Sequence, residues 1–185
     1  MLTSFFRKRI EAMERTMGHD LTYLKDVLTA DPKALLRFAK IHDISEYRQG
    51  VPPSVHYAVK LVSTLAEDCG PCAQVVVDLA VRDGVAPAIL QAIVQGSDER
   101  LPRAELLGVK FARACLARDP SADALREQVV QQWGKRGLIS LGYAMIAARA
   151  YPTLKYALGY GQSCTRLTVD GTEFKAQPSA GVNAA

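Results

Sequence analysis

The 185-residue sequence contains no long hydrophobic run and no marked excess of charge of one sign. A membrane-spanning helix needs roughly 18–20 consecutive apolar residues. The longest candidate, Leu138–Ala148, contains Gly142 and is ended by Arg149. The net charge is only +4, and the basic residues are scattered among acidic ones, whereas nucleic-acid binding needs a continuous basic surface. Glu11 and Glu14 also stand where a signal peptide would need its apolar segment. We therefore expect a cytoplasmic protein that binds neither membranes nor nucleic acid.

Cysteine is scarce as well, and four cysteines in a chain of this length do not form a disulfide scaffold. Cys115 and Cys164 stand alone, whereas Cys69 and Cys72 are three residues apart. In a cytosolic protein this spacing indicates redox chemistry or half of a metal site. A zinc ion needs four ligands, and the sequence has no second CxxC and no HxxxH pair, so we expect no metal and no other cofactor. A purely structural pair remains the third interpretation.

What the sequence has in abundance is apolar residues at helical spacing, in segments separated by Gly, Pro and Asp. We predict an all-α multi-helix bundle. The expected helices are Phe5–Met17, one capped by Asp20, one opened by Asp31-Pro32, one capped by Ser54, one from the CxxC to Asp83-Gly84, then Pro87–Val94, Arg103–Ala117, Ala122–Trp133 and Leu138–Leu158.

Only the C-terminal tail suggests strand, where Asp170-Gly171 separates Leu167–Val169 from Thr172–Phe174 and predicts a short hairpin. We expect a single all-helical domain over residues 1–160, with a core around the CxxC over residues 52–158. Residues 161–185 form the tail.

The Cys69-Gly70-Pro71-Cys72 motif falls at a predicted helix start, where thiols at positions i and i+3 can bridge. Unsatisfied N–H groups and the helix dipole at such a start lower a thiol pKa from about 8.5. Pro71 suits a first turn because its missing N–H is not needed there. Asp68 can cap the helix, although its negative charge opposes thiolate formation. Thioredoxins contain the same four letters, but their fold needs a buried strand before the motif, and the spacing from Val55 onward is helical.

Several features together resemble the alkylhydroperoxidase D-like superfamily, which includes the carboxymuconolactone decarboxylases. These are the helix before the CxxC, the helix that starts on it, Gly84, and the later run from Leu125 to Arg149. The resemblance covers residues 52–158. It implies an all-α bundle that assembles as a homo-oligomer. The activity implied is thiol-dependent reduction of a peroxide, or disulfide exchange with a protein reductant.

The resemblance also implies roles for the cysteines, with Cys72 attacking the peroxide and Cys69 resolving the intermediate. The two roles are exchanged if Cys69 is the more exposed. The family motif carries a histidine four residues after its second cysteine, where this sequence has Val76. The family glutamate corresponds to a position near His56 and Tyr57.

Three residues are candidates to replace that proton relay. Glu67 is a candidate base, and its alternative is a solvated carboxylate at a helix end. His56 is a candidate proton carrier if its helix packs antiparallel to the next, and Tyr57 is a candidate hydrogen-bond donor. The alternative for His56 is a surface or capping role. A second function, from another class, is a non-catalytic helical oligomer or partner-binding protein on the same scaffold. Decarboxylation or isomerisation of a lactone has no support from particular residues.

Overall fold

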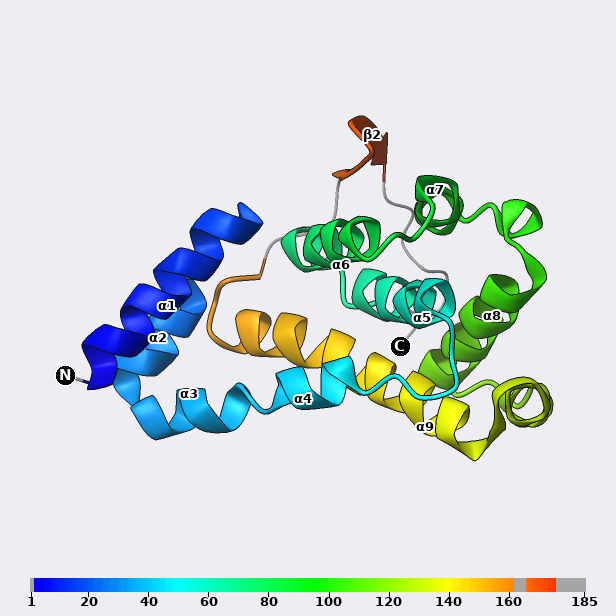
Figure 1. The fold of residues 1–185 in the computed structure, drawn as a ribbon, viewed down its shortest axis with the longest axis horizontal. Helices are drawn as coiled ribbons and strands as arrows, with labels where there is room; N and C mark the ends of the chain where they lie inside the picture. The colour runs from blue at the N-terminus through cyan, green and yellow to red at the C-terminus, as the bar shows by residue number, and fades with distance from the viewer. Residues whose placement is uncertain (1, 162–165, 176–185) are drawn as a thin grey trace.

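The structure, a computed structural model, describes residues 2–161 and 166–175. It is all-α with one small hairpin, as the sequence predicted (Figure 1). The elements are α1 (Leu2–Met17), α2 (Thr22–Ala30), α3 (Pro32–Phe38), α4 (Ile41–Glu46), α5 (Pro53–Leu65), α6 (Gly70–Arg82), α7 (Pro87–Gln95), the 3₁₀ turn η1 (Asp98–Arg100), α8 (Arg103–Ala117), α9 (Ala122–Ala157), β1 (Arg166–Val169) and β2 (Thr172–Lys175).

Helix α5 is the centre of the main hydrophobic core. Every residue from Val55 to Leu65 is buried, because α6, α7, α8 and α9 all pack against this helix. The helical spacing from Val55 onward is confirmed, and this helix has no face toward solvent. Gly108 on α8 permits the close approach of α8, since a Cβ there would lie only 2.8 Å from Val55 Cγ1. Helix α5 therefore lies inside the bundle, and the CxxC follows it in the chain.

Helix starts agree only in part with the predicted caps. The Asp31 carboxylate accepts a hydrogen bond from the Lys33 N–H and caps α3, as expected. Asp20 accepts from both the N–H and the hydroxyl of Thr22, just before α2. Ser54 does not cap α5, because the helix already begins at Pro53. A proline at the first helical position has no N–H to satisfy, so this start needs no side-chain cap.

A break at Gly134 divides α9 into two helical parts. Gly134 has φ 69° and ψ −179°, which are not helical values. The predicted division into Ala122–Trp133 and a second helix from Leu138 is therefore confirmed. The second part crosses beneath α5 and continues toward the N-terminal helices (Figure 1).

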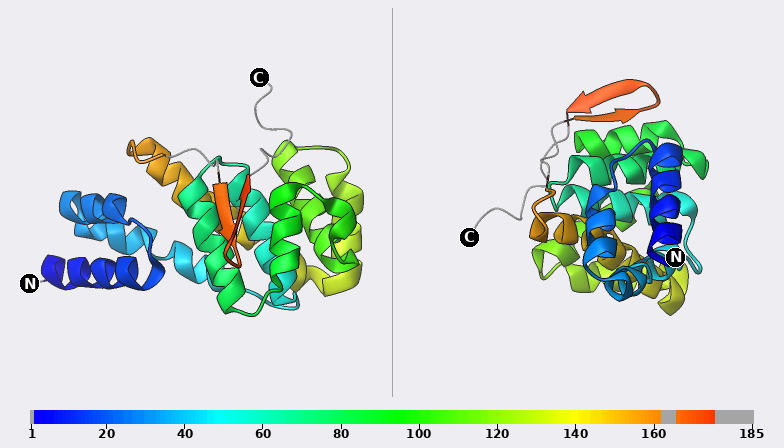
Figure 2. Two further views of the ribbon diagram at one scale, coloured as in Figure 1. Left: turned by 90° about the horizontal axis from the view of Figure 1, so that it is seen from above. Right: turned by 90° about the vertical axis from the view of Figure 1, so that its left-hand side faces the viewer.

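Helices α1–α3 form a smaller second hydrophobic cluster at one end of the molecule (Figure 2). Leu154 near the end of α9 and Tyr160 just after the helix pack against this cluster. The end of α9 therefore joins the two clusters, and the junction lies beside the start of α6. The predicted single domain over residues 1–160 stays a prediction.

The tail hairpin lies over α6 and α7 (Figure 2). Its strands pair antiparallel, with Leu167 opposite Phe174. Asp170 and Gly171 both have positive φ, 50° and 74°, as a two-residue hairpin turn requires. Leu167 and Val169 are almost fully buried in the main core. The hairpin is therefore confirmed, and this part of the tail packs on the helical domain.

Candidate functional site

Cys69 and Cys72 lie at the start of α6 and form a disulfide across its first turn. Their Cα atoms are 5.3 Å apart. Cys69 is the residue immediately before the helix, and Pro71 lies in the first turn as the sequence predicted. Cys69 is completely buried, whereas Cys72 is 8% exposed. Of the two sulfur-bearing residues, Cys72 is therefore the more accessible.

The turn before the motif explains why α6 starts at this point. Helix α5 ends at Leu65, and the N–H groups of Glu67 and Asp68 donate to carbonyls of its last turn. Asp68 has φ 49°, a left-handed conformation that reverses the chain direction. Asp68 was expected to cap α6, but the cap position is held by Cys69. The turn makes α5 and α6 an antiparallel pair with the CxxC at its closed end.

Two side chains of α9 hold this turn. Arg149 Nε donates to Glu67 Oε1 in an ion pair, and the Tyr156 hydroxyl donates to the Asp68 carbonyl at 3.0 Å. Arg149 and Tyr156 are seven residues apart, which places them on the same face of α9 two turns apart. Sequence reasoning missed both residues. The available signal was this seven-residue spacing of polar side chains on a largely apolar helix.

The predicted residue Glu67 is thus part of the CxxC surroundings. Its side chain is 18% exposed and pairs with Arg149, so it is neither fully solvated nor free of a partner. The ion pair places the guanidinium of Arg149, which is 82 residues away in sequence, beside the turn that precedes Cys69. A nearby positive charge favours the thiolate form of a cysteine.

The structure does not bring His56 and Tyr57 to the sulfurs. The two helices do pack antiparallel, but that packing places the start of α5 beside the end of α6. The Tyr57 hydroxyl donates to Asp83 Oδ2 at 2.7 Å, and Asp83 follows the last residue of α6. At about 1.5 Å per residue, Asp83 lies roughly 20 Å along the helix from Cys69.

His56 and Tyr57 instead belong to a buried polar cluster at that far end. His56 Nε2 lies 3.1 Å from the Ser45 carbonyl, and its Nδ1 is buried with no partner in the described part of the chain. Burial lowers the pKa of His56 to about 4, and the Lys60 charge adds to this. Burial likewise raises the pKa of Tyr57. The Lys60 ammonium lies 5.2 Å from the centre of the Tyr57 ring.

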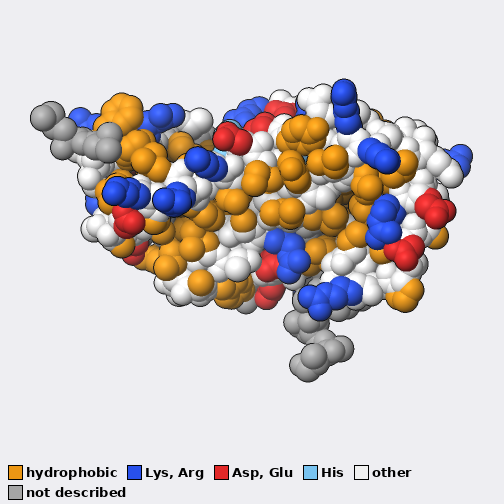
Figure 3. All heavy atoms as spheres, turned by 90° about the horizontal axis from the view of Figure 1, so that it is seen from below, with side chains coloured by type: hydrophobic (Ala, Val, Ile, Leu, Met, Phe, Trp, Pro, Cys, Tyr) orange, Lys and Arg blue, Asp and Glu red, His pale blue; other side chains and the backbone are white. Residues whose placement is uncertain are grey.

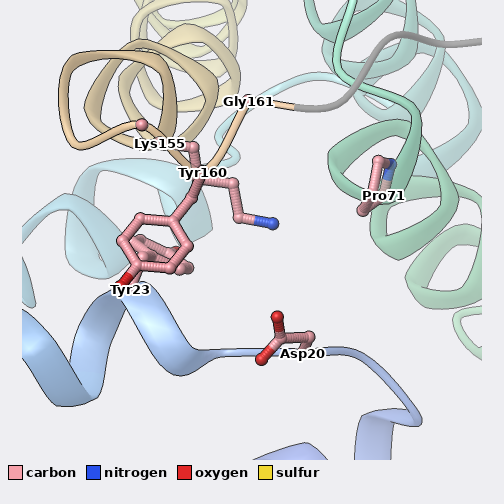
Figure 4. A pocket seen from close by; sticks show the side chains of 7 residues that line it. Asp20, Tyr23, Pro71, Lys155, Tyr160 and Gly161 are labelled. Carbon is pink, nitrogen blue, oxygen red and sulfur yellow. The ribbon is translucent and has the colours of Figure 1, made fainter.

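A pocket of about 160 Å³ opens beside the first turn of α6 (Figure 4). Pro71, between the two cysteines, forms one wall. Lys155 projects into the pocket from the end of α9, with Asp20 on the loop before α2 facing it (Figure 4). The remaining lining residues are Tyr23, Gly159, Tyr160 and Gly161. Nothing in the sequence pattern predicted this pocket, because its residues come from three distant segments.

Other features of the site limit its chemistry. Val76, which stands where the family motif has histidine, is buried in the main core, so this position offers no proton carrier. Within residues 2–161 and 166–175, no group of three or more His, Cys, Asp or Glu side chains is placed to hold a metal ion. Cys115 is a partly buried free thiol whose pKa is raised by burial. Cys164 lies outside the described residues.

The chain matches no protein-family model, no curated protein and no solved structure. None of the described helices is long and apolar enough to cross a membrane.

Proposed function

We propose that the protein is a thiol–disulfide oxidoreductase that uses the Cys69/Cys72 pair, with peroxides among its oxidants. The observation that carries the proposal is the position of the pair. Two cysteines close enough to bridge lie at a helix N-terminus, in a turn held by the Arg149–Glu67 ion pair. The helix dipole favours a thiolate there, and the Arg149 side chain lies at the same turn.

The exposure of the two residues supports Cys72 as the attacking thiol and Cys69 as the resolving one. The Cys72 thiolate attacks one peroxide oxygen, the O–O bond breaks, and the alkoxide leaves as an alcohol after taking a proton from water. The sulfenic acid on Cys72 then reacts with the Cys69 thiol, which forms the disulfide and releases water. An external dithiol returns the pair to the reduced state by two thiol–disulfide exchanges.

Membership of the alkylhydroperoxidase D-like superfamily is part of the same proposal. A helix ahead of the CxxC, a second helix that starts on it and an all-α surrounding are consistent with the resemblance. Glu67 takes the place of a general base, with Arg149 as its partner. His56 and Tyr57 are not part of this proposed site, because their hydrogen bonds fix them at the far end of α5.

The experiment compares the pair with an ordinary thiol of the same chain. In a Cys115→Ser, Cys164→Ser background, alkylation across pH and oxidation by cumene hydroperoxide report only on Cys69 and Cys72. We expect one thiol with a pKa clearly below about 8.5 and rapid loss of both thiols with peroxide. Cys72→Ser should abolish the fast reaction. Cys69→Ser should leave a sulfenic acid on Cys72 that dimedone traps.

The matched control is a Cys69→Ser, Cys72→Ser, Cys164→Ser variant, which retains only the partly buried Cys115. Its thiol should react slowly, because burial raises its pKa. Oxidation of the Cys69/Cys72 pair no faster than that of Cys115 would overturn the proposal. Arg149→Met should raise the pKa of the attacking thiol, because it removes the nearby positive charge.

One observation favours the second candidate, a non-catalytic oligomer. Ile139, Tyr143 and Ile146 on α9 are 45%, 39% and 55% exposed and recur at steps of four and three, so they share one helix face. Figure 3 shows hydrophobic side chains gathered along the middle of the face where α4 and α9 lie. A helix face of this kind is typical of subunit contacts. A slow, ordinary Cys69/Cys72 pair in a stable oligomer would favour this candidate over the oxidoreductase.

A further inference from the structure

The pocket beside Pro71 contains a lysine that the proposed dithiol chemistry does not use. Lys155 is only 9% exposed, and its ammonium faces the open space of the pocket (Figure 4). The Lys155 ammonium lies over the Tyr23 ring, with Nζ 5.1 Å from the ring centre. Among the residues that the structure describes, Nζ has no hydrogen-bond or ion-pair partner. An ammonium that keeps unused donors in a pocket, on a side chain that is otherwise mostly buried, is positioned to bind an anionic ligand group.

Asp20 supplies the opposite charge in the same pocket. Its Oδ1 accepts both hydrogen bonds from Thr22, which leaves Oδ2 as an acceptor toward the pocket. The Thr22 hydrogen bonds lower the pKa of Asp20, so the group is a carboxylate at neutral pH. Asp20 and Lys155 influence each other through space but form no ion pair in the described part of the chain. The pocket therefore presents one positive and one negative group that a ligand can bridge.

The size and walls of the pocket restrict that ligand. A volume of about 160 Å³ is similar to a cavity that holds benzene, so it accommodates a head group of a few heavy atoms. The Tyr23 and Tyr160 rings and Pro71 provide apolar walls. Because Pro71 lies between Cys69 and Cys72 in the chain, a head group in the pocket lies beside the turn that carries the sulfurs.

We infer that the pocket binds the α-amino-acid head group of a small disulfide such as cystine, with the carboxylate on Lys155 and the ammonium on Asp20. This inference rests on the proposed function. The reduced pair supplies two electrons: the Cys72 thiolate attacks one ligand sulfur, the ligand S–S bond breaks, and the first cysteine leaves. Cys69 then attacks the mixed disulfide, forms the protein disulfide and releases the second cysteine. Each product takes up the proton lost by one protein thiol.

Three disulfides separate the contributions of the two charges. Cystine has both head-group charges, 3,3′-dithiodipropionate has only the carboxylates, and cystamine has only the amines. The rate of disulfide formation in the reduced protein, in the Cys115→Ser, Cys164→Ser background, is measured with each. Ratios of variant to parent rates for one disulfide cancel the different leaving-group chemistry.

Lys155→Met should slow the reaction with cystine and dithiodipropionate by roughly tenfold, as expected for loss of one charge-assisted hydrogen bond, and should not slow the reaction with cystamine. Asp20→Asn should slow cystine and cystamine but not dithiodipropionate. Asparagine keeps the oxygen that accepts from Thr22, so the start of α2 is preserved. Lys135→Met, at an exposed lysine of the same helix, is the control and should change none of the three rates.

The outcomes separate this inference from the function on which it rests. Equal ratios for all three disulfides in Lys155→Met and Asp20→Asn would overturn the recognition of the head group and leave the dithiol chemistry intact. A parent protein that reacts with neither the disulfides nor cumene hydroperoxide faster than an ordinary thiol would overturn the proposed function itself.

Discussion

The buried histidine at the start of α5 shows how strongly a single side chain can link stability to pH. His56 is 2% exposed, and burial lowers its pKa to about 4 from an ordinary value near 6.5. The folded protein therefore holds the neutral imidazole at pH values where the unfolded chain already binds a proton. As pH falls from about 6.5 to 4, the unfolded state gains protons that the native state does not, so stability is lost over that window.

We expect His56→Gln to flatten this pH dependence. The full effect of the native histidine is about 3 kcal/mol of unfolding free energy between pH 7 and pH 4. Glutamine retains a donor for the Ser45 carbonyl but does not titrate. Urea unfolding at pH 7, 5.5 and 4.5 measures the unfolding free energy of the parent and of His56→Gln. The control is His42→Gln, because His42 is exposed. An unchanged slope in His56→Gln would contradict the assignment of the pH dependence to this residue.

The neighbouring Tyr57 tests where the polar cluster lies relative to the disulfide. Tyr57→Phe removes the hydroxyl that donates to Asp83, and a hydrogen bond to a charged group contributes about 1.5–3 kcal/mol. We expect the unfolding free energy to fall by about that amount, measured as a lower urea midpoint. Because the hydroxyl is at the far end of α6, the pKa of the reactive cysteine, measured by alkylation, should not move. A shifted thiol pKa would contradict this separation.

At this scale the sequence predicted the residues that are local in the chain and missed those brought in by packing. Cys69, Cys72 and Glu67 lie within six residues, so a helix start places them together. Arg149 and Lys155 reach the same region only because α9 crosses beneath α5 and ends beside α6. His56 was a candidate because α5 and α6 were expected to pack antiparallel. That packing is observed, but it places the start of one helix beside the end of the next, so His56 lies at the opposite end of α6 from the sulfurs.

Between elements, the clearest contact is the one that attaches the tail hairpin to the CxxC helix. The Gln74 side chain donates to the Thr168 carbonyl and accepts from the Thr168 N–H, each at 2.8 Å. Its amide thus pairs with β1 as a neighbouring strand would. Gln74 also donates to Asp78, which in turn lies 2.8 Å from His19 Nε2. One face of α6 therefore connects the hairpin to the loop after α1.

Gln74→Ala should release the hairpin from α6. We expect faster hydrogen exchange at the Thr168 amide and a loss of about 1–3 kcal/mol in unfolding free energy, because two backbone groups lose their partner and Leu167 and Val169 are less well covered. Gln131→Ala, at an exposed glutamine of α9, should change neither measurement. Undiminished protection of Thr168 in the first variant would contradict this docking.

For the hairpin, the sequence pattern predicts the turn but not the place where the hairpin packs. Its turn follows from Asp170-Gly171, since only residues that tolerate positive φ close a two-residue turn of this kind. Its place on α6 depends on the length and direction of the Gln74 side chain. The spacing of apolar residues in the sequence contains no information on that contact. The break in α9 was predictable in the same local way, from the glycine at position 134.

For the whole molecule, the question is what covers the apolar face of α9. The stripe formed by Ile139, Tyr143 and Ile146 continues beside Tyr47, whose ring centre lies 5.4 Å from that of Tyr143. A second copy of the chain, which presents the same face, is the occupant that the homo-oligomer prediction requires. An isologous contact then brings two α9 helices together around one axis.

We expect the protein to form a dimer that Ile146→Glu converts to a monomer, because the substitution places like charges opposite each other at the shared axis. Ile146 is 55% exposed within one chain, so the fold of the single chain should be unaffected. Light scattering over a range of concentrations, together with helical circular dichroism, measures both properties. Leu36→Glu, at a similarly exposed residue of α3 outside the stripe, should remain dimeric. A parent protein that is monomeric at about tens of micromolar, the concentration used for scattering, would contradict the dimer. A dimer that persists in Ile146→Glu would show that the contact uses another surface.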